Sequence, residues 1–286
     1  MFGFFRKKEE PYISILAGTE EEEEDFSGEG LRVSAVSDVG FLREGNEDNF
    51  YADGIGIKPD GDCLLSSVVG GLDRYLFAVC DGMGGEAYGE LASGISVAAL
   101  KERADVLRSV DISSLHSAVN DFADAANSGI CRMAEQKKCG RSGSTLAMAC
   151  IDNGFVYSFN LGDSRVYYYR GGKVTRLSQD HTLAAKKLRD GISSAEGRNS
   201  SDAHKLITFL GVDDDGVGLT AYAHEPVELL DGKVLICSDG LTDMLSDAEI
   251  AKVLSEEHIN YSEALAEKAL EKGGFDNVTC IVVNKK

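Results

Sequence analysis

The sequence predicts an α+β fold in which antiparallel β-sheets are covered on their outer faces by helices. Two observations predict it. The strand-like segments come in closely spaced groups joined by short turns, as in hairpins. The long helical segments come in consecutive pairs, and each pair can cover one face of a sheet. A regular alternation of strand and helix is absent, which disfavours a doubly wound parallel sheet.

The first half of the domain is predicted to contain four strands followed by two long helices. Alternating or continuous apolar residues predict strands at 31–40, 49–54, 63–71 and 74–82. Apolar residues at helical spacing predict helices at 86–109 and 113–138. The last of the four strands is strongly apolar and ends at Asp81.

The second half begins with four strands in quick succession, predicted at 144–152, 155–163, 165–172 and 173–180. Asn153-Gly154 and Gly171-Gly172 are hairpin signals between them. Residues 183 to about 215 are less regular, with a short helix predicted at 183–191. The rest is predicted to form strands at 218–226 and 233–240, helices at 246–256 and 260–273, and a final strand at 277–284.

Composition separates an N-terminal arm from the domain. Residues 1–30 contain a continuous acidic block from Glu20 to Asp25, and like charges repel and bury nothing, so we expect a flexible arm before a domain at 31–286. The net charge of −19 argues against nucleic acid and against an anionic membrane surface as partners. No apolar run approaches the ~20 residues of a membrane span, and the first residues make a poor signal peptide.

The seven cysteines are spread along the chain without a CxxC pair, and their number is odd. Several lie in apolar strand-like runs, as Cys80 and Cys237 do. This distribution predicts reduced, buried thiols in a cytoplasmic protein rather than a disulfide framework or a zinc site.

Four aspartates stand at the ends of predicted strands: Asp81, Asp163, Asp239 and Asp276. Carboxylates that converge at one sheet end repel one another unless a cation neutralises them. Oxygen ligands without His or Cys favour Mg²⁺ or Mn²⁺ over Zn²⁺. For the single motif DGMGG after the first strand group, a tight turn with an aspartate that caps the next helix is the competing interpretation.

The segment GFLREGNEDNF places Arg43 beside Glu47 and Asp48. A guanidinium offers a planar fork that matches the oxygens of a phosphate. Taken alone, this segment is better explained as a surface loop that carries an ordinary charge pair.

Together these segments resemble the metal-dependent Ser/Thr protein phosphatase family (PPM, type 2C) in its compact bacterial form. The ordered motifs that carry the resemblance are VSDVGFLREGNEDN, AVCDGMGG, GSTLAMACI, NLGDSRVYYY, LSQDHT, CSDGLTDML and DNVTCIVV. They run from about residue 34 to residue 283 and so cover nearly the whole domain. The resemblance implies a four-layer α-β-β-α sandwich of two antiparallel sheets flanked by helix pairs.

The resemblance also implies a binuclear Mn²⁺ or Mg²⁺ centre. Asp81 matches the carboxylate that bridges the two ions. The carbonyl of Gly82 and the side chain of Glu47 match ligands of one ion. Asp239 and Asp276 match ligands of the other.

Three further residues match family positions around this centre. Asp48 matches an acid just behind the metal ligands, and Arg43 matches the arginine that holds the substrate phosphate. Asp163 matches a ligand of a third, weaker ion, whose remaining ligand from the 190–215 segment stays unassigned. The implied reaction is attack of a metal-activated water on phosphoserine or phosphothreonine, with Arg43 and Asp81 as the central catalytic residues.

The resemblance has one departure and several implied partners. Many eukaryotic members have a His where this chain has Met83, so the acid that protonates the leaving group is not identified. His181, in LSQDHT, is interpreted as a structural residue. The implied partners are phosphorylated proteins, including a Ser/Thr kinase or its targets, and the chain is expected to act as a monomer.

Two alternatives remain beside a broad protein phosphatase. A non-catalytic binding module on the same fold would be expected to lose metal carboxylates, whereas all the expected ones are present. A phosphatase that acts on a single regulatory phosphoprotein cannot be separated from a broad one by sequence.

Overall fold

The computed structural model describes residues 14–16, 30–84, 88–192, 202–212 and 218–286. The predicted arm at 1–30 lies almost entirely outside these residues. Within it, Ser14–Leu16 forms β1, which pairs with β5 in parallel, so this short stretch is a sheet strand and departs from the prediction. In the described part of the chain, no helix is both long and apolar enough to cross a lipid bilayer.

Two sheets form the centre of the molecule, and both are antiparallel apart from β1. The first has the order β1-β5-β2-β15-β14-β10-β11, and the second has the order β12-β9-β8-β6-β3-β4, with β13 paired to β9 and β7 to β6. The strands of the first sheet are β1 (Ser14–Leu16), β2 (Leu31–Asp38), β5 (Cys63–Val69), β10 (Arg165–Arg170), β11 (Lys173–Arg176), β14 (Lys233–Cys237) and β15 (Val278–Lys285). Those of the second are β3 (Asp48–Ala52), β4 (Gly56–Ile57), β6 (Arg74–Met83), β7 (Gly143–Ser144), β8 (Leu146–Asp152), β9 (Phe155–Leu161), β12 (Tyr222–Ala223) and β13 (Val227–Glu228).

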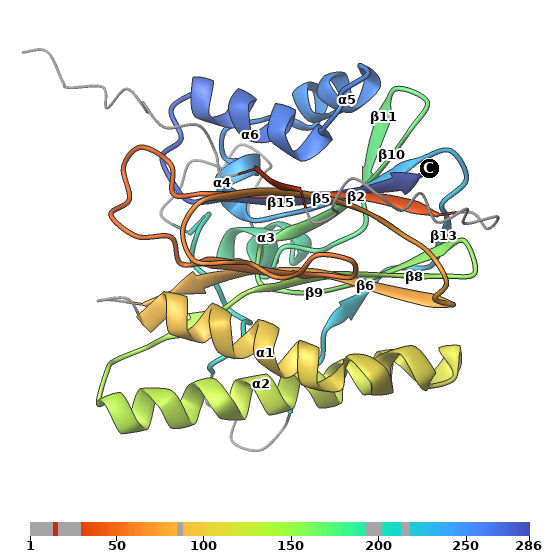
Figure 1. The fold of residues 1–286 in the computed structure, drawn as a ribbon. Helices are drawn as coiled ribbons and strands as arrows, with labels where there is room; N and C mark the ends of the chain where they lie inside the picture. Colours follow the sequence, from red (N-terminus) through yellow and green to blue (C-terminus); the bar gives the residue numbers. More distant parts are fainter. Residues whose placement is uncertain (1–13, 17–29, 85–87, 193–201, 213–217) are drawn as a thin grey trace, which may run out of the picture.

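Helix pairs cover the two outer faces, which makes four layers (Figure 1). The second sheet is covered by α1 (Tyr88–Ser109) and α2 (Leu115–Lys137), with the single turn η1 (Ile112–Ser114) between them. The first sheet is covered by α5 (Asp247–Ser255) and α6 (Tyr261–Glu271). Two shorter helices, α3 (Leu183–Arg189) and α4 (Asp239–Thr242), lie in connections. The predicted sandwich is therefore confirmed.

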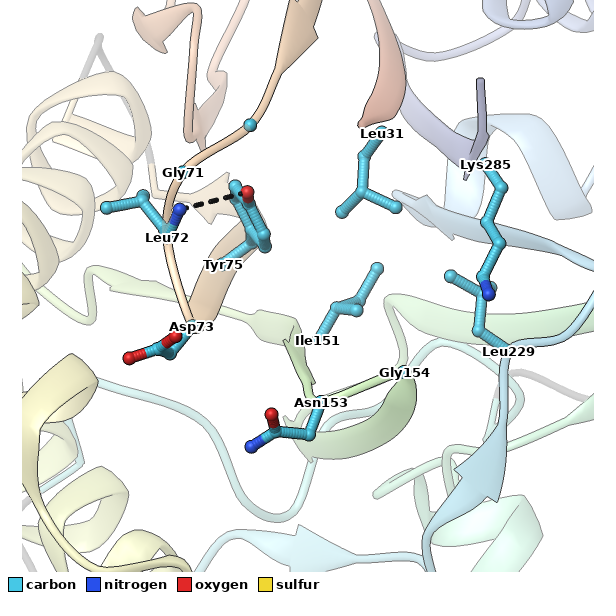
Figure 2. A pocket seen from close by; sticks show the side chains of 11 residues that line it. Leu31, Gly71, Leu72, Asp73, Tyr75, Ile151, Asn153, Gly154, Leu229 and Lys285 are labelled. Atoms are coloured by element: carbon cyan, nitrogen blue, oxygen red, sulfur yellow. Dashed lines mark hydrogen bonds between the residues drawn. The ribbon is translucent and has the colours of Figure 1, made fainter. Parts of the chain in front are cut away.

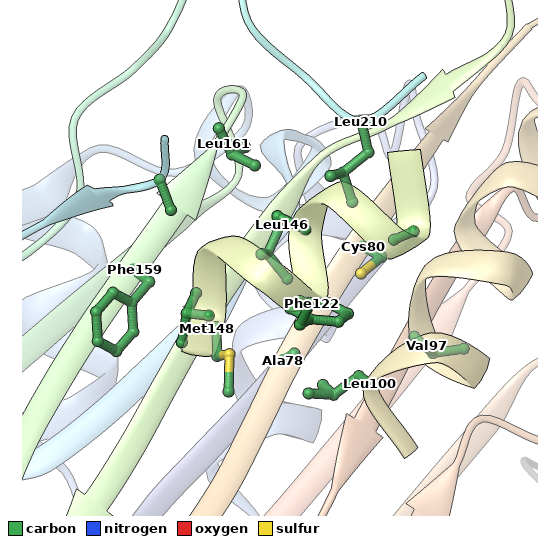
Figure 3. Close-up of a cluster of buried hydrophobic side chains, with 14 of the residues drawn as sticks. Ala78, Cys80, Val97, Leu100, Phe122, Leu146, Met148, Phe159, Leu161 and Leu210 are labelled. Carbon is green, nitrogen blue, oxygen red and sulfur yellow. The ribbon is translucent and has the colours of Figure 1, made fainter. Parts of the chain in front are cut away.

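Three buried clusters hold the four layers together, one at each interface between layers. In β8 every residue is buried, because its alternate side chains enter different clusters. Met148 packs toward α1 and α2, whereas Ala147 and Ala149 pack between the sheets. Figure 3 shows the helix-side cluster, in which Phe122 and Leu100 face Met148. Burial on both faces explains why the central strands are continuously apolar rather than alternating.

The predicted elements differ from the observed ones mainly where they are short. Of the strand predicted at 218–226, only Tyr222–Ala223 (β12) is a strand; β13 follows it at Val227–Glu228, and the strand predicted at 173–180 ends at Arg176. The strand β4 and the helix α4 are not in the prediction, and β7 shares only Ser144 with the strand predicted at 144–152. These elements are two to four residues long, so local periodicity does not report them.

The antiparallel register gathers particular strand ends at one end of the sandwich. Asp48, at the start of β3, pairs with Asp81 near the end of β6. Cys237, at the end of β14, pairs with both Arg165 and Cys280. The Oγ of Ser238 then donates a hydrogen bond of 2.7 Å to Asp48 Oδ2 and joins the two sheets at this end.

The opposite end of the sandwich has a cavity of about 340 Å³. Apolar residues from both sheets line it, including Leu31, Tyr75 and Leu229 (Figure 2). The hydroxyl of Tyr75 accepts a hydrogen bond of 3.1 Å from the backbone N–H of Leu72, which fixes the loop at its mouth.

Candidate metal centre

Asp81 stands in the middle of the acidic end of the sandwich. Its backbone N–H donates to Thr145 Oγ1 at 2.9 Å, and its carbonyl accepts from the Thr145 N–H at 2.8 Å. Burial raises the pKa of its carboxyl well above the usual range, and the charges of other aspartates raise it further, with Asp48 and Asp239 the strongest among them. The strand therefore holds this acid rigidly in surroundings that penalise its charge.

Gly82 allows three backbone segments to approach closely. A Cβ on this residue would lie 2.1 Å from the carbonyl oxygen of Gly89 and 2.5 Å from that of Glu47. The N–H of Gly82 donates to the Glu47 carbonyl at 3.2 Å. Any side chain here would separate the end of β6 from the first turn of α1 and from the Glu47 loop.

The carboxylate of Glu47 lies against the first turn of α1. A Cβ on Gly89 would lie 2.6 Å from the Cδ atom of Glu47. Burial raises the pKa of Glu47, while the charge of Arg43 and a hydrogen bond with the Gly89 backbone lower it. The side chain thus interacts with the positive end of the helix at the edge of the acidic group.

Asp48 is fully buried behind these residues and accepts the hydrogen bond from Ser238. Burial raises its pKa to about 7, although the hydrogen bonds from Ser238 and Thr279 lower it. Asp48 is therefore a buried acid that is hydrogen-bonded at the end of β3, and its predicted role behind the metal ligands stays a prediction.

Asp163 enters the same end from the turn between β9 and β10. Burial raises its pKa to about 8, followed by the charges of Asp239 and Asp180. The backbone N–H of Gly162 donates to His181 Nδ1 at 3.2 Å, and the His181 N–H donates back to the Gly162 carbonyl at 2.9 Å. Burial, followed by the charge of Arg189, lowers the pKa of His181, so its ring accepts this bond in the neutral form.

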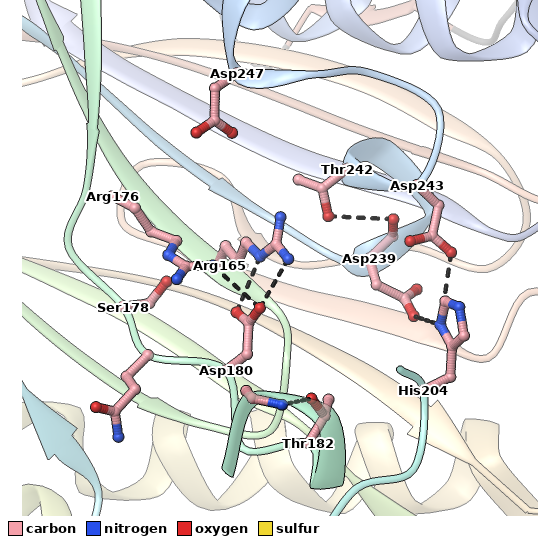
Figure 4. A network of polar contacts seen from close by, with 12 residues as sticks. Arg165, Arg176, Ser178, Asp180, Thr182, His204, Asp239, Thr242, Asp243 and Asp247 are labelled. Carbon is pink, nitrogen blue, oxygen red and sulfur yellow. Dashed lines mark hydrogen bonds and ion pairs between the residues drawn. The ribbon is translucent and has the colours of Figure 1, made fainter. Parts of the chain in front are cut away.

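Asp180 is a nearby acid with very different surroundings. It accepts hydrogen bonds from Arg165 Nε at 3.0 Å and from Arg165 Nη2 at 2.8 Å, and Arg176 Nη1 adds a third at 3.0 Å. Burial acts to raise its pKa, but the hydrogen bonds and charges of the two arginines lower it overall. Asp180 is therefore a paired structural acid, in contrast to Asp163 (Figure 4).

Asp239 begins the short helix α4, and the sequence reasoning missed two of its neighbours. His204 Nδ1 lies 3.9 Å from Asp239 Oδ2 and 3.8 Å from Asp243 Oδ2 (Figure 4). Within the described residues, these three form the one trio of His, Cys, Asp and Glu whose ligand atoms all lie within 4.8 Å of one another. The pKa of His204 is raised to about 9, chiefly by its contact with Asp239 and then by the charge of Asp243.

A signal for Asp243 was present in the sequence, since it follows Asp239 by one helical turn in CSDGLTDML. No local signal marks His204, because it comes from the irregular segment before residue 212. Of the trio, only Asp239 belongs to the ligand set implied by the family resemblance.

Asp276 and Arg43 pair directly, with 2.6 Å between Arg43 Nη2 and Asp276 Oδ2. The side chain of Asn277 joins the loops that carry these two residues through hydrogen bonds. Its Nδ2 donates to the carbonyls of Val39 at 2.9 Å and Gly45 at 3.0 Å, and its Oδ1 accepts from the Glu47 N–H at 2.8 Å. The predicted phosphate-binding arginine is thus half exposed at the rim and is held by a predicted metal ligand.

The donor set at this end fits a hard divalent cation. Asp81 is influenced by the charges of Asp48, Asp163, Asp239 and Asp276, all of the same sign as its own. Buried carboxylates that repel one another gain stability from a metal ion, and oxygen donors favour Mg²⁺ and Mn²⁺.

The buried cysteines are excluded as nucleophiles by their surroundings. Five of the seven cysteines are buried. Burial raises the pKa of Cys150 to about 12 and that of Cys63 to about 11, so these thiols stay protonated at neutral pH. The expectation of mostly buried thiols is confirmed.

Comparison with known proteins identifies the family. Residues 59–273 match the family model described as protein phosphatase 2C. The chain belongs to the protein phosphatase 2C family. Over 262 residues it is 31% identical to the serine/threonine protein phosphatase PstP of Mycobacterium tuberculosis, covering 89% of this chain and 45% of that protein. It is 30% identical over 258 residues to the serine/threonine phosphatase stp of Listeria innocua, covering 87% of this chain and 94% of that protein.

The fold agrees with the family. A crystal structure of the PstP catalytic domain in complex with two manganese ions superimposes with a TM-score of 0.71 at 30% identity, over 90% of this chain and 99% of that chain. The predicted class, a metal-dependent Ser/Thr protein phosphatase of the PPM type, is therefore confirmed at the level of family and fold. The chain spans less than half the length of PstP, so the activity of that whole protein is a separate matter.

Proposed function

We propose that this chain hydrolyses phosphoserine and phosphothreonine monoesters of proteins at a binuclear Mn²⁺ or Mg²⁺ centre. The observation that carries the proposal is the convergence of like-charged buried carboxylates at the same end of a family fold as an exposed arginine. The names of the matched relatives, which are serine/threonine phosphatases, support the substrate class.

The proposed centre uses residues from four separate strand ends. Asp81 would hold both ions, Glu47 and the carbonyl of Gly82 would hold one of them, and Asp239 and Asp276 would hold the other. When bound, the cations would lower the pKa of a water molecule and neutralise charge on the phosphoryl oxygens. Asp163 would hold a third ion together with Asp239. The charge of Asp239 raises the pKa of Asp163.

The remaining steps depend on the protein's own side chains. A substrate phosphate would compete with Asp276 for Arg43, and a guanidinium can bind two phosphate oxygens through parallel hydrogen bonds. Asp48 would keep its hydrogen bond from Ser238 and so hold the ends of β3 and β14 together under the reacting group. The buried cysteines take no part, because burial keeps their thiols protonated.

The finer features of the function are also proposals. The substrates would be phosphoproteins, including a Ser/Thr kinase or its targets, and the chain would act as a monomer. Five buried cysteines suit a reducing compartment, which supports a cytoplasmic location. The catalytic domain would comprise residues 31–286.

The test is Mn²⁺-dependent release of phosphate from a phosphothreonine peptide by the wild type and by Asp239→Asn. We expect activity in the wild type and a loss of about 100-fold or more in the variant, because an electrostatic stabiliser of the reacting group is removed. Equal activity in both proteins would remove Asp239 from the mechanism. A wild type that folds, binds Mn²⁺ and turns over neither peptides nor native phosphoproteins would instead indicate a binding module.

A further inference from the structure

Three exposed apolar side chains lie on two loops beside Arg43. Phe41 is 48% exposed, Leu42 is 68% exposed and Phe275 is 56% exposed. Single exposed apolar residues are common on protein surfaces and need no explanation. Here three occur together, and we call Phe41, Leu42 and Phe275 the apolar rim.

The two loops that carry the apolar rim are held firmly against each other. The backbone N–H of Phe41 donates to the Gly274 carbonyl at 2.8 Å. Gly40 has φ +75°, and a Cβ there would lie 2.3 Å from the Asp276 carbonyl oxygen, so the loops are in backbone contact. The exposure of the rim is therefore a property of a fixed surface, and a fixed surface loses little entropy when it binds a partner.

The apolar rim is continuous with the proposed phosphate site. Leu42 precedes Arg43 and Phe275 precedes Asp276, and these two charged residues pair at 2.6 Å. Neighbouring residues of a chain are ~3.8 Å apart. The residues on either side of a phosphorylated residue held by Arg43 would therefore be within reach of the rim.

Charge around the rim restricts which sequences fit. Glu44 is exposed in the same loop, and Asp243 is exposed at this end of the molecule. These carboxylates repel acidic residues next to the phosphorylated residue. Apolar side chains avoid that repulsion and bury rim surface, which is favourable in water.

We propose that the apolar rim binds an aliphatic or aromatic side chain of the substrate protein, one or two residues from its phosphorylated Ser or Thr. The inference rests on the proposed function and adds a substrate class to it, namely phosphorylation sites with apolar neighbours and without acidic ones. Phe41, Leu42 and Phe275 are then specificity-determining residues that take no part in phosphate hydrolysis.

The test compares phosphothreonine peptides that are identical except that the residues flanking the phosphothreonine are either Leu or Ser. With Mn²⁺, we expect the wild type to show a kcat/KM about tenfold higher for the Leu peptide, mainly through a lower KM. In Leu42→Ser and in Phe275→Ser this preference should fall toward one. The matched control is Ile259→Ser, whose side chain is 109% exposed between α5 and α6, and it should keep the full preference.

Failure of the inference and failure of the proposed function give different results. Equal kcat/KM values for the two peptides in an active wild type overturn the role of the rim and leave the phosphatase activity intact. A wild type that hydrolyses neither peptide nor p-nitrophenyl phosphate overturns both. Light scattering that finds a wild-type dimer and a monomeric Phe275→Ser would make the rim a contact between two copies, which also overturns the proposal.

Discussion

The strand β6 carries a charged residue near each end, buried Arg74 and partly buried Asp81, and the two have opposite surroundings. At its start, Arg74 Nη2 lies 2.6 Å from Asp152 Oδ2, and Arg74 Nη1 donates to the carbonyls of Leu107 at 2.6 Å and Val110 at 2.9 Å. Near its end, Asp81 is surrounded by acids of its own sign. The first charge is paired within the fold, whereas the second is stabilised by a bound cation or removed by protonation.

The difference indicates that one end of β6 stabilises the fold and the other end binds a ligand. The Arg74 end joins β6, β8 and the end of α1 through a paired charge, and it borders the apolar cavity. At the Asp81 end, several carboxylates repel one another, and a bound cation or protonation relieves this repulsion. Functional sites commonly reduce the stability of the protein in this way, and the rest of the fold compensates.

The largest effect is expected at the paired end. Arg74→Met leaves Asp152 buried without its cation and leaves two helix carbonyls without a donor, so unfolding should become easier by about 3–5 kcal/mol. Urea denaturation monitored by circular dichroism measures this loss. The control is Arg103→Met, at an exposed position on α1, and it should change the free energy of unfolding little. A loss of similar size in both variants would contradict the comparison.

The acidic end should respond most to metal. At a free Mn²⁺ concentration of 100 times the dissociation constant, binding to the folded state should add about 2.7 kcal/mol of stability per site. A thermal melt with and without Mn²⁺ checks this expectation, and a chelator should reverse the gain. A melting temperature that does not respond to Mn²⁺ or Mg²⁺ would argue against a cation site at this end.

A smaller effect, opposite in sign to that of Arg74→Met, is expected when charge is removed from the acidic end. In the metal-free protein, Asp81→Asn should increase stability by about 1–2 kcal/mol, because a neutral amide replaces a buried, repelled carboxylate. The same variant should lose most of the stabilisation by Mn²⁺. Destabilisation of the metal-free variant, measured in the same denaturation experiment, would mean that the carboxylate has a favourable partner.

The pH dependence of the free energy of unfolding should differ between the metal-free and the metal-bound protein. Asp163 has a folded pKa of about 8 and Asp48 one of about 7, both above the value of ~3.9 expected when unfolded. Their contribution is therefore fully present below about pH 4 and is lost as the pH rises to about 8. We expect the metal-free protein to lose stability over that window, and Asp163→Asn to make the slope shallower. An unchanged slope in this variant would show that Asp163 does not titrate there.

The agreement between prediction and structure also differs between the long and the short elements. The long elements α1, α2, β6 and β8 were predicted because their periodicity or continuous apolar character is a local property of the sequence. The short helix α4 and the short strands β4 and β7 were not, since each is only two to four residues long and carries too little periodicity to be recognised. Asp81 and Asp239 were chosen as site residues because they end apolar strands, and the structure brings them to the same end.

The sequence by itself determined the layered fold, the family and the acids available for chemistry, because apolar periodicity and motif order are written along the chain. Only the tertiary structure decided which charges meet. The pairing of Arg43 with Asp276, the contact of His204 with Asp239 and the apolar rim each join segments far apart in the sequence. Their energies depend on burial and on the register of long-range strand pairs, and both are properties of the assembled sheets.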